Sequence, residues 1–119
     1  MTIGFIGLGN MAKAMIGGIL EKGLMAPNEI IGTAATEETR KKVAEKFGIQ
    51  VRTSNEAVAK EADIIILAVK PQYLKVVIAD IMDSVDDKKL VVTELTKLKE
   101  KTTDELIQNI FVMCVKKLK

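Results

Sequence analysis

The stretch Gly4-Phe5-Ile6-Gly7-Leu8-Gly9-Asn10-Met11-Ala12 decides the fold that we predict for this chain. A short apolar run bounded by glycine predicts a buried strand, and the apolar spacing after Asn10 predicts a helix. Glycine weakens strands and helices unless a special backbone is required. Three glycines at this junction therefore indicate that the strand-to-helix turn is the functional part of the segment.

Outward from this turn, apolar runs and helical patterns alternate along the chain. The run Asp63 to Val69 is apolar on both faces, which is typical of a central strand in a parallel sheet. Strict alternation with short links predicts an α/β fold, a parallel sheet with helices on both faces. The predicted strands are residues 2–6, 29–33, 49–53, 63–69 and 89–93, and the predicted helices are 10–22, 36–47, 54–60 and a helix from Pro71.

Two of these helices carry specific expectations. Thr36 is a candidate N-cap with acidic residues in the turn after it, and Gly48 is expected to end the same helix. Proline suits the first turn of a helix, which favours a start at Pro71. The apolar positions that this last helix is expected to turn toward the sheet are Leu74, Val77, Ile78 and Ile81.

The composition of the chain fits a single globular domain spanning residues 1–119. It has 119 residues, 48% hydrophobic and 29% charged, with a net charge of +2. This balance favours neither a nucleic-acid surface nor a membrane surface, and no apolar segment reaches the roughly 20 residues of a membrane span. The single cysteine excludes an intramolecular disulfide, so we expect a reducing, cytoplasmic location. Histidine is absent, and we expect no metal.

Residues 93–119 depart from the regular pattern and are interpreted as a diverged or truncated tail. Within them, Thr103 to Gln108 is expected to form a helix and Ile110 to Val115 a final strand. Cys114 lies in that apolar run and is expected to be an inert buried thiol. The basic end of the chain is interpreted as a solvated terminus, with a nucleic-acid contact as the alternative.

The glycine turn matches a known spacing. Gly7-Leu8-Gly9-Asn10-Met11-Ala12 fits G-x-G-x-x-G/A, the dinucleotide-binding fingerprint of Rossmann-like folds. Gly7 would allow the tight turn, Gly9 would let a pyrophosphate approach the backbone, and the small Ala12 would let the helix pack closely on the strand. The helix N-terminus would then offer N–H groups to the phosphates. The alternative is a glycine-rich turn without a ligand.

The end of the second predicted strand bears on the choice between NAD and NADP. An acid there usually binds the ribose hydroxyls of NAD, but residues 32–36 contain none, and Glu29 lies at the other end of the strand. Thr33 and Thr36 could donate to a 2′-phosphate, with Arg40 one helical turn further on. We therefore favour NADP, with NAD as the alternative. For Thr36 we favour a helix cap over a direct ligand, whereas for Arg40 a solvated helix face is an equal alternative.

A second candidate segment is Ala68-Val69-Lys70-Pro71, at the carboxyl end of the buried strand. In open α/β sheets, ligands bind beyond the carboxyl ends of the strands. The small side chain of Ala68 would leave room for a cofactor, and Pro71 fixes the turn. Lys70 either contacts the cofactor or is an ordinary exposed cation.

Together, these motifs resemble the N-terminal dinucleotide-binding domain of the pyrroline-5-carboxylate reductases. The resemblance rests on the glycine turn, on Ser54-Asn55-Glu56-Ala57 and on Ala68-Val69-Lys70-Pro71-Gln72, and it covers residues 2–92. It implies an NADP-dependent oxidoreductase that reduces 1-pyrroline-5-carboxylate to proline, in proline biosynthesis. The cofactor-binding residues that it implies are Ile6, Gly7, Leu8, Gly9, Asn10, Met11, Thr33, Ala34, Asn55, Ala68, Val69, Lys70 and Pro71. For Asn55, a helix cap beside Ser54 is the alternative.

The chain also departs from that family. Thr93-Glu94-Leu95-Thr96-Lys97 stands where the family has an Ala-Ala-Gly stretch, and Val112-Met113-Cys114-Val115 stands where it has Met-Pro-Asn. The family's helical C-terminal domain, which supplies the dimer and most of the substrate pocket, is not represented. We can therefore name no catalytic residue, and self-association through an uncovered apolar face is an open expectation. The alternatives are a free-standing NADP-binding module without turnover, a related imine- or F420-linked NADP reductase, and a scaffold that has lost the ligand.

Overall fold

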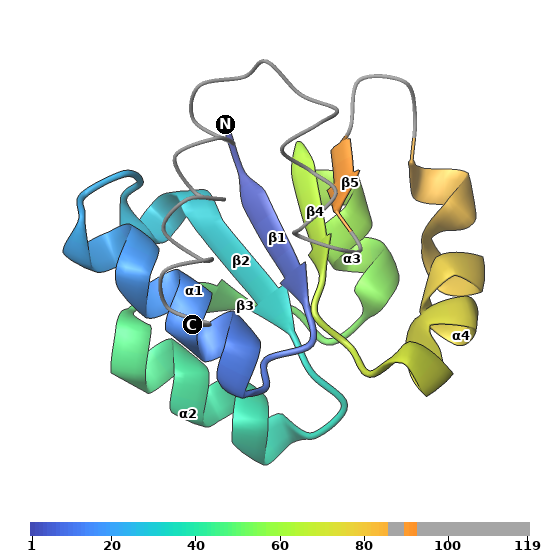
Figure 1. Cartoon of the computed structure of the whole chain (residues 1–119), viewed down its shortest axis with the longest axis horizontal. Helices are drawn as coiled ribbons and strands as arrows, with labels where there is room; N and C mark the ends of the chain where they lie inside the picture. Colours follow the sequence, from blue (N-terminus) through green and yellow to red (C-terminus); the bar gives the residue numbers. More distant parts are fainter. Residues whose placement is uncertain (86–89, 93–119) are drawn as a thin grey trace.

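The computed structural model describes residues 1–85 and 90–92, and Figure 1 shows a sheet flanked by helices. The predicted alternation of strands and helices is confirmed there, with strands somewhat shorter than expected. The expected helix 103–108, the expected strand 110–115 and Cys114 lie outside the described residues. The elements are β1 (Ile3–Ile6), α1 (Asn10–Glu21), η1 (Pro27–Glu29), β2 (Ile30–Thr33), α2 (Glu37–Phe47), β3 (Gln50–Val51), α3 (Asn55–Glu61), β4 (Ile64–Leu67), α4 (Pro71–Ile81), η2 (Met82–Ser84) and β5 (Leu90–Val92).

The strands form a parallel sheet in the order β3-β2-β1-β4-β5. The chain moves from β1 outward to β2 and β3, and then crosses to β4 on the other side of β1. The order of the strands therefore reverses between β1 and β4. In open α/β sheets, the crevice at the carboxyl ends of the strands beside such a reversal is where ligands bind.

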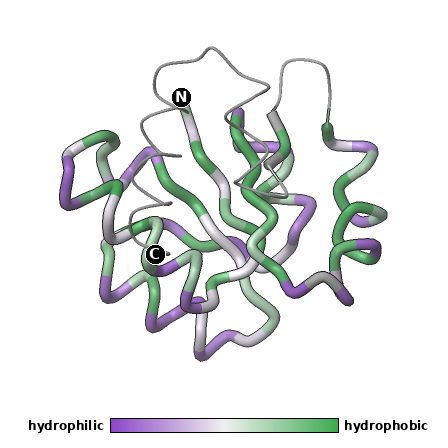
Figure 2. Tube along the Cα trace, in the orientation of Figure 1, coloured by the Kyte–Doolittle hydropathy of each residue, from purple (hydrophilic) through white to green (hydrophobic). Residues whose placement is uncertain are grey.

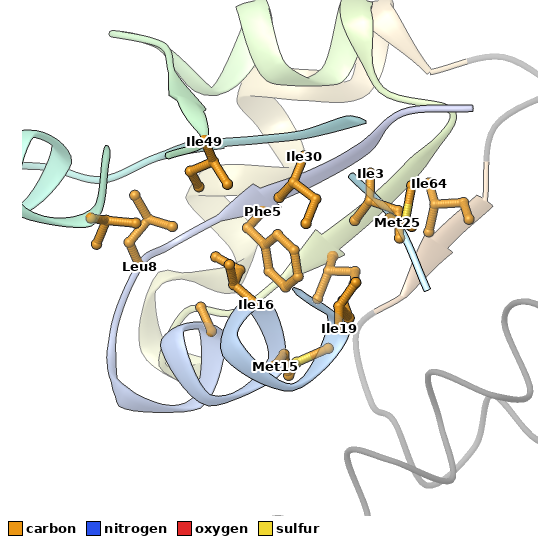
Figure 3. Packing of buried hydrophobic residues seen from close by; sticks show 13 residues of the cluster. Ile3, Phe5, Leu8, Met15, Ile16, Ile19, Met25, Ile30, Ile49 and Ile64 are labelled. Atoms are coloured by element: carbon orange, nitrogen blue, oxygen red, sulfur yellow. The ribbon is translucent and has the colours of Figure 1, made fainter. Parts of the chain in front are cut away.

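Helices cover both faces of the sheet, and successive side chains of each strand point to opposite faces. Ile3 and Phe5 of β1 pack against α1 and α2, whereas Ile6 packs against α3 and α4. Figure 3 shows the Phe5 ring at the centre of the first cluster, beside Ile16 and Ile19 of α1. Figure 2 shows the hydrophobic residues concentrated along the central strands, as expected for a sheet covered on both faces.

One glycine lets α3 pack directly on the backbone of β1. A Cβ atom at Gly4 would lie 2.5 Å from Val58 Cγ1 and 2.8 Å from the Cβ of Ala62. Real Cβ atoms do not approach so closely, so a side chain at this position would force α3 away from the sheet. Gly4 therefore sets the distance between α3 and the strand that leads into the glycine turn.

The predicted helix ends are confirmed, and one predicted core residue is wrong. Thr36 Oγ1 accepts a hydrogen bond from Thr39 N at 3.3 Å, and Gly48 ends α2 with a φ of 72°. In α4, Val77 and Ile81 are buried, but Ile78 is 41% exposed. Each residue adds about 100° around a helix axis, so Ile78 lies beyond the edge of the face that carries Val77.

A two-hydrogen-bond ion pair joins the residue after β3 to the end of α3. Arg52 Nε and Nη2 donate to the Glu61 carboxylate oxygens at 2.6 and 2.8 Å. The hydrogen bond from Arg52 lowers the pKa of the Glu61 carboxyl below its ordinary value, and the same contact raises the pKa of Arg52. The pair therefore stabilises the folded chain above the ordinary pKa of a glutamate, and its contribution is lost as the pH falls through the folded-state pKa.

We predict that a double-mutant cycle with Arg52→Gln and Glu61→Gln gives a coupling free energy of about 0.5–1 kcal/mol at pH 7, because the pair has good geometry but is partly exposed. Urea unfolding between pH 7 and pH 3 measures it, and the coupling should decline with falling pH. The matched control is the more exposed pair Lys42–Glu38 of α2, for which the coupling should be smaller. A coupling independent of pH would contradict the assignment.

Candidate functional site

Gly7 brings the carboxyl ends of three strands together. Its N–H donates to Thr33 O, in the last residue of β2, at 2.9 Å, and Ala68 N, just after β4, donates to Ile6 O at 2.8 Å. Gly7 has a φ of 100°, and a Cβ atom there would clash with the carbonyl oxygen of Ala68. Both features require glycine, which confirms the tight turn predicted at this position.

The buried side chain of Leu8 fixes the glycine turn to the sheet. Its side chain is 2% exposed, and a Cβ atom on Gly32 of β2 would lie 2.8 Å from Leu8 Cδ2. Figure 3 shows Leu8 at one end of the core cluster, apart from Phe5 and the α1 side chains. Leu8 can therefore offer a ligand only its backbone, and its side chain holds the loop onto the sheet.

Gly9 is the N-cap of α1 and leaves the N-terminus of this helix open. Gly9 O accepts the first helical hydrogen bond, from Lys13 N at 3.0 Å, so the amides of the first turn have no partner within the helix. No side chain caps them, and the first turn carries no acid. A Cβ atom at Gly9 would meet nothing within 4 Å. This open space beside unpaired amides fits a bound diphosphate group.

The other fingerprint residues divide between surface and core. Asn10 and Met11, the first two residues of α1, are exposed at the open end of the helix, whereas Ala12 is fully buried in the cluster between α1 and the sheet. Ile6 is also buried, in the cluster on the opposite face. Its carbonyl accepts a hydrogen bond from Ala68 N, and its buried side chain is not available to a ligand.

The segment after β4 lies beside this open helix end. Val69 Cγ1 would be 3.1 Å from a Cβ atom on Gly7, and Ala68 and Val69 are half-buried. Lys70 is the N-cap of α4 and is exposed, and its carbonyl accepts from Tyr73 N at 2.9 Å. Pro71 occupies the first position of α4, as predicted. The structure thus brings the two predicted segments together at the reversal between β1 and β4.

At the end of β2, the threonine hydroxyls are less accessible to a ligand than the sequence predicts. Thr33 is only 2% exposed, and Thr36 caps α2, so neither hydroxyl is freely presented to a ligand. Arg40 returns from α2 to the end of β2, where its Nη1 donates to Ala34 O at 2.7 Å. The alternative that Arg40 belongs only to a solvated helix face is therefore wrong. Sequence spacing indicated that Arg40 was close, but not which way its guanidinium points.

The structure gives Asn55 a partner that the sequence did not indicate. Ser54 is the cap of α3, accepting from Ala57 N at 3.1 Å, which rules out the cap alternative for Asn55. Asn55 Nδ2 instead donates to Asp80 Oδ2 in α4 at 3.2 Å. The two residues are 25 positions apart, so no local signal could have paired them. Within the described part of the chain, this side-chain hydrogen bond directs Asn55 toward α4 and not toward the glycine turn.

Titratable groups do not concentrate at the glycine turn. Apart from Arg52 and Glu61, the one clear pKa shift among the described residues is at Glu56, where the hydrogen bond from Lys60 lowers the carboxyl pKa. In the same part of the chain, no group of three His, Cys, Asp or Glu residues could hold a metal ion, and no helix is long and apolar enough to cross a membrane. The part of the glycine turn that the structure leaves open thus consists of backbone groups, without a titratable side chain whose pKa is clearly shifted.

The chain is similar to known NADP-dependent oxidoreductases and to pyrroline-5-carboxylate reductases. A family model described as NADP oxidoreductase, coenzyme F420-dependent, matches residues 2–97. The pyrroline-5-carboxylate reductase of Methanosarcina acetivorans is 38% identical over 91 residues, which cover 76% of this chain and 34% of that protein. The chain thus spans about a third of the length of this curated relative.

Solved structures share the fold. A pyrroline-5-carboxylate reductase from Coxiella burnetii matches with a TM-score of 0.69 and 30% identity, covering 92% of this chain and 39% of that one. Pyrroline carboxylate reductase from Plasmodium falciparum, in a structure with NADP bound, matches with a TM-score of 0.72 and 20% identity, covering 96% of this chain and 55% of that one. At that identity the second match supports the fold alone.

We predict opposite responses of Gly7 and Gly9 to the same substitution. Gly7→Ala should lower the free energy of unfolding by about 1–3 kcal/mol, because alanine is strained at a positive φ and meets Ala68. Gly9→Ala should change it by less than about 0.5 kcal/mol, because Gly9 has a φ of −79° and open space around it. Urea unfolding compares the two variants, and equal losses would contradict the assigned roles.

Proposed function

This chain belongs to the family described as NADP oxidoreductase, coenzyme F420-dependent, and we propose that it binds NADP at the carboxyl edge of its sheet. The observation that carries the proposal is the open N-terminus of α1, where Gly9 leaves space beside amides that have no acceptor within the helix. A helix N-terminus favours negative charge, and phosphate oxygens accept from such amides. The pyrophosphate of NADP supplies both the negative charge and the acceptor oxygens.

The other residues that we propose to contact the cofactor lie on two sides of this diphosphate position, one for each nucleoside half. Ala68, Val69, Lys70 and Pro71 would flank the nicotinamide half, because they follow β4 on one side of the strand reversal. Residues after β2, beginning at Ala34, would adjoin the adenosine half on the other side. Asn55 is proposed on the adenosine side by resemblance alone, since its amide is bonded to Asp80.

We further propose that the protein formed by this chain reduces 1-pyrroline-5-carboxylate to proline. The supporting observations are the match to pyrroline-5-carboxylate reductases and the segment Ala68-Val69-Lys70-Pro71-Gln72. When bound, NADPH supplies the hydride that, with one proton, converts the C=N bond of the substrate into the C–N bond of proline. The chain's own residues would hold the cofactor in place and exclude water from its buried side. We assign no catalytic residue.

Two alternatives are supported by specific observations. The described site offers backbone amides and no assigned catalytic side chain, which favours a cofactor-binding module without turnover. The description of the matching family model favours an NADP reductase that exchanges hydride with the deazaflavin coenzyme F420. Self-association and a cytoplasmic location also stay proposals, supported by the exposed Val76 and Ile78 of α4 and by the single cysteine.

We predict that Gly9→Leu abolishes tight cofactor binding without unfolding the chain. Isothermal calorimetry with NADPH should show a loss of affinity of at least about tenfold, because the leucine fills the space beside the amides of α1. Asn28→Leu is the matched control, since it places the same side chain before β2, at the opposite edge of the sheet. A folded Gly9→Leu variant with undiminished affinity would refute the site.

An activity assay separates the functional alternatives once binding is established. Consumption of NADPH with 1-pyrroline-5-carboxylate, matched by formation of proline, supports the reductase. Consumption with oxidised F420 alone supports the second family activity. Binding of NADPH without either reaction supports the binding module, and the absence of binding by the unmodified chain contradicts the whole proposal.

A further inference from the structure

The outward face of α4, continued by the η2 turn, exposes apolar side chains. Val76 is 63% exposed, Met82 is 65% exposed, and Ile78 is exposed as well. Elsewhere in the described part of the chain, the exposed large hydrophobic side chains are those of Met1 and Met11. Figure 1 shows α4 at one side of the molecule, beyond α3. Exposed apolar side chains that cluster on one element are typical of an interaction surface.

Two charged residues on this face have no opposite charge within reach on their own helix. Ion pairs along a helix join residues three or four positions apart. The positions at that spacing from Lys75 are uncharged, and those before Asp83 are Ala79 and Asp80. Neither Lys75 nor Asp83 takes part in an ion pair among the described residues. Asp83 also follows the C-terminus of α4, where the helix dipole disfavours negative charge.

The spacing of these residues makes the face complementary to a second copy of itself. Lys75, Ala79 and Asp83 are exposed and four positions apart, so they form one row along the helix. Rows of this spacing interdigitate in the commonest class of helix packing. In an antiparallel pair of helices related by a two-fold axis at Ala79, Lys75 of each copy lies level with Asp83 of the other. Val76 then lies level with Met82, and the small Ala79 lets the two backbones approach closely.

We propose that two copies of this chain associate through α4, packed antiparallel about a two-fold axis at Ala79. In a symmetric dimer each contact occurs twice, with the two partners exchanged. The pairing of Lys75 with Asp83 meets this condition, whereas parallel helices would bring Lys75 beside its own copy. The neighbouring Asp80 is bonded to Asn55, so it does not compete as a free carboxylate.

This inference rests on the proposed self-association and deepens it, because it names the surface and the orientation of the two copies. It requires no bound cofactor. One helix face per copy is small beside a standard protein interface, so the dimer should be weak, with a dissociation constant of about 10–100 μM.

The test is sedimentation equilibrium of charge variants, over concentrations that bracket this dissociation constant. Lys75→Glu and Asp83→Lys should each weaken the dimer at least about tenfold, because each places like charges together twice in the interface. The double variant exchanges the two charges and should restore the dissociation constant to within about threefold of the unmodified chain. Lys41→Glu is the matched control, since it makes the same charge change on the exposed face of α2, and its effect should stay below about threefold.

Loss of folding would not explain a loss of dimer in these variants. Both positions are exposed, and Asp83→Lys places a cation where the helix dipole favours one, so urea unfolding should show no loss of stability. If the unmodified chain stays monomeric, the proposed self-association and this interface both fail. If it dimerises but the single variants have no effect, or the double variant does not recover, this interface is refuted and self-association stands. NADPH binding is measured separately by calorimetry, so neither result bears on the proposed cofactor site.

Discussion

The rest of the structure depends on the contact at Gly7, where the ends of β1, β2 and β4 meet. Its N–H bonds to the last carbonyl of β2, and its bare Cα faces the carbonyl that follows β4. With a φ of 100°, the chain leaves β1 in a direction that other residues rarely allow. That direction sets where α1 begins and therefore where its unpaired amides point.

The packing of the sheet explains why we propose the binding site at this edge. Residues of β1 and β4 alternate between two buried clusters, so neither face of the sheet is open to a ligand. The carboxyl edge is different, because every helix from α1 to α4 begins there and the loops lie outside the core. The strand order reverses beside β1, so the loop after β2 and the loop after β4 lead away on different sides. In open α/β sheets, ligands bind in the crevice between two such loops.

The proposed recognition of an anionic dinucleotide relies on few charged side chains. The net charge of the chain is only +2, and most of its charged residues are interspersed. At the glycine turn, the favourable electrostatics come from the helix end and not from clustered cations. Lys70 and Arg40 add charge on opposite sides of that turn, one after β4 and one beside the end of β2. In the proposed site, affinity would therefore depend mainly on backbone groups.

The sequence by itself determined the order of the elements, the parallel sheet, the glycine turn and the helix ends at Thr36 and Gly48. These follow from local rules: hydrophobic period, capping chemistry and the conformations open to glycine. Ile78 was assigned to the wrong face because apolar spacing alone does not say where a helix face ends.

Only the tertiary structure decided the pairing of Asn55 with Asp80, the return of Arg40 to Ala34 and the bonds between Arg52 and Glu61. Each joins residues whose approach depends on how separate elements pack or on which way a long side chain turns. Hydrophobic periodicity specifies the buried face of an element, but leaves such polar contacts open until the elements are assembled.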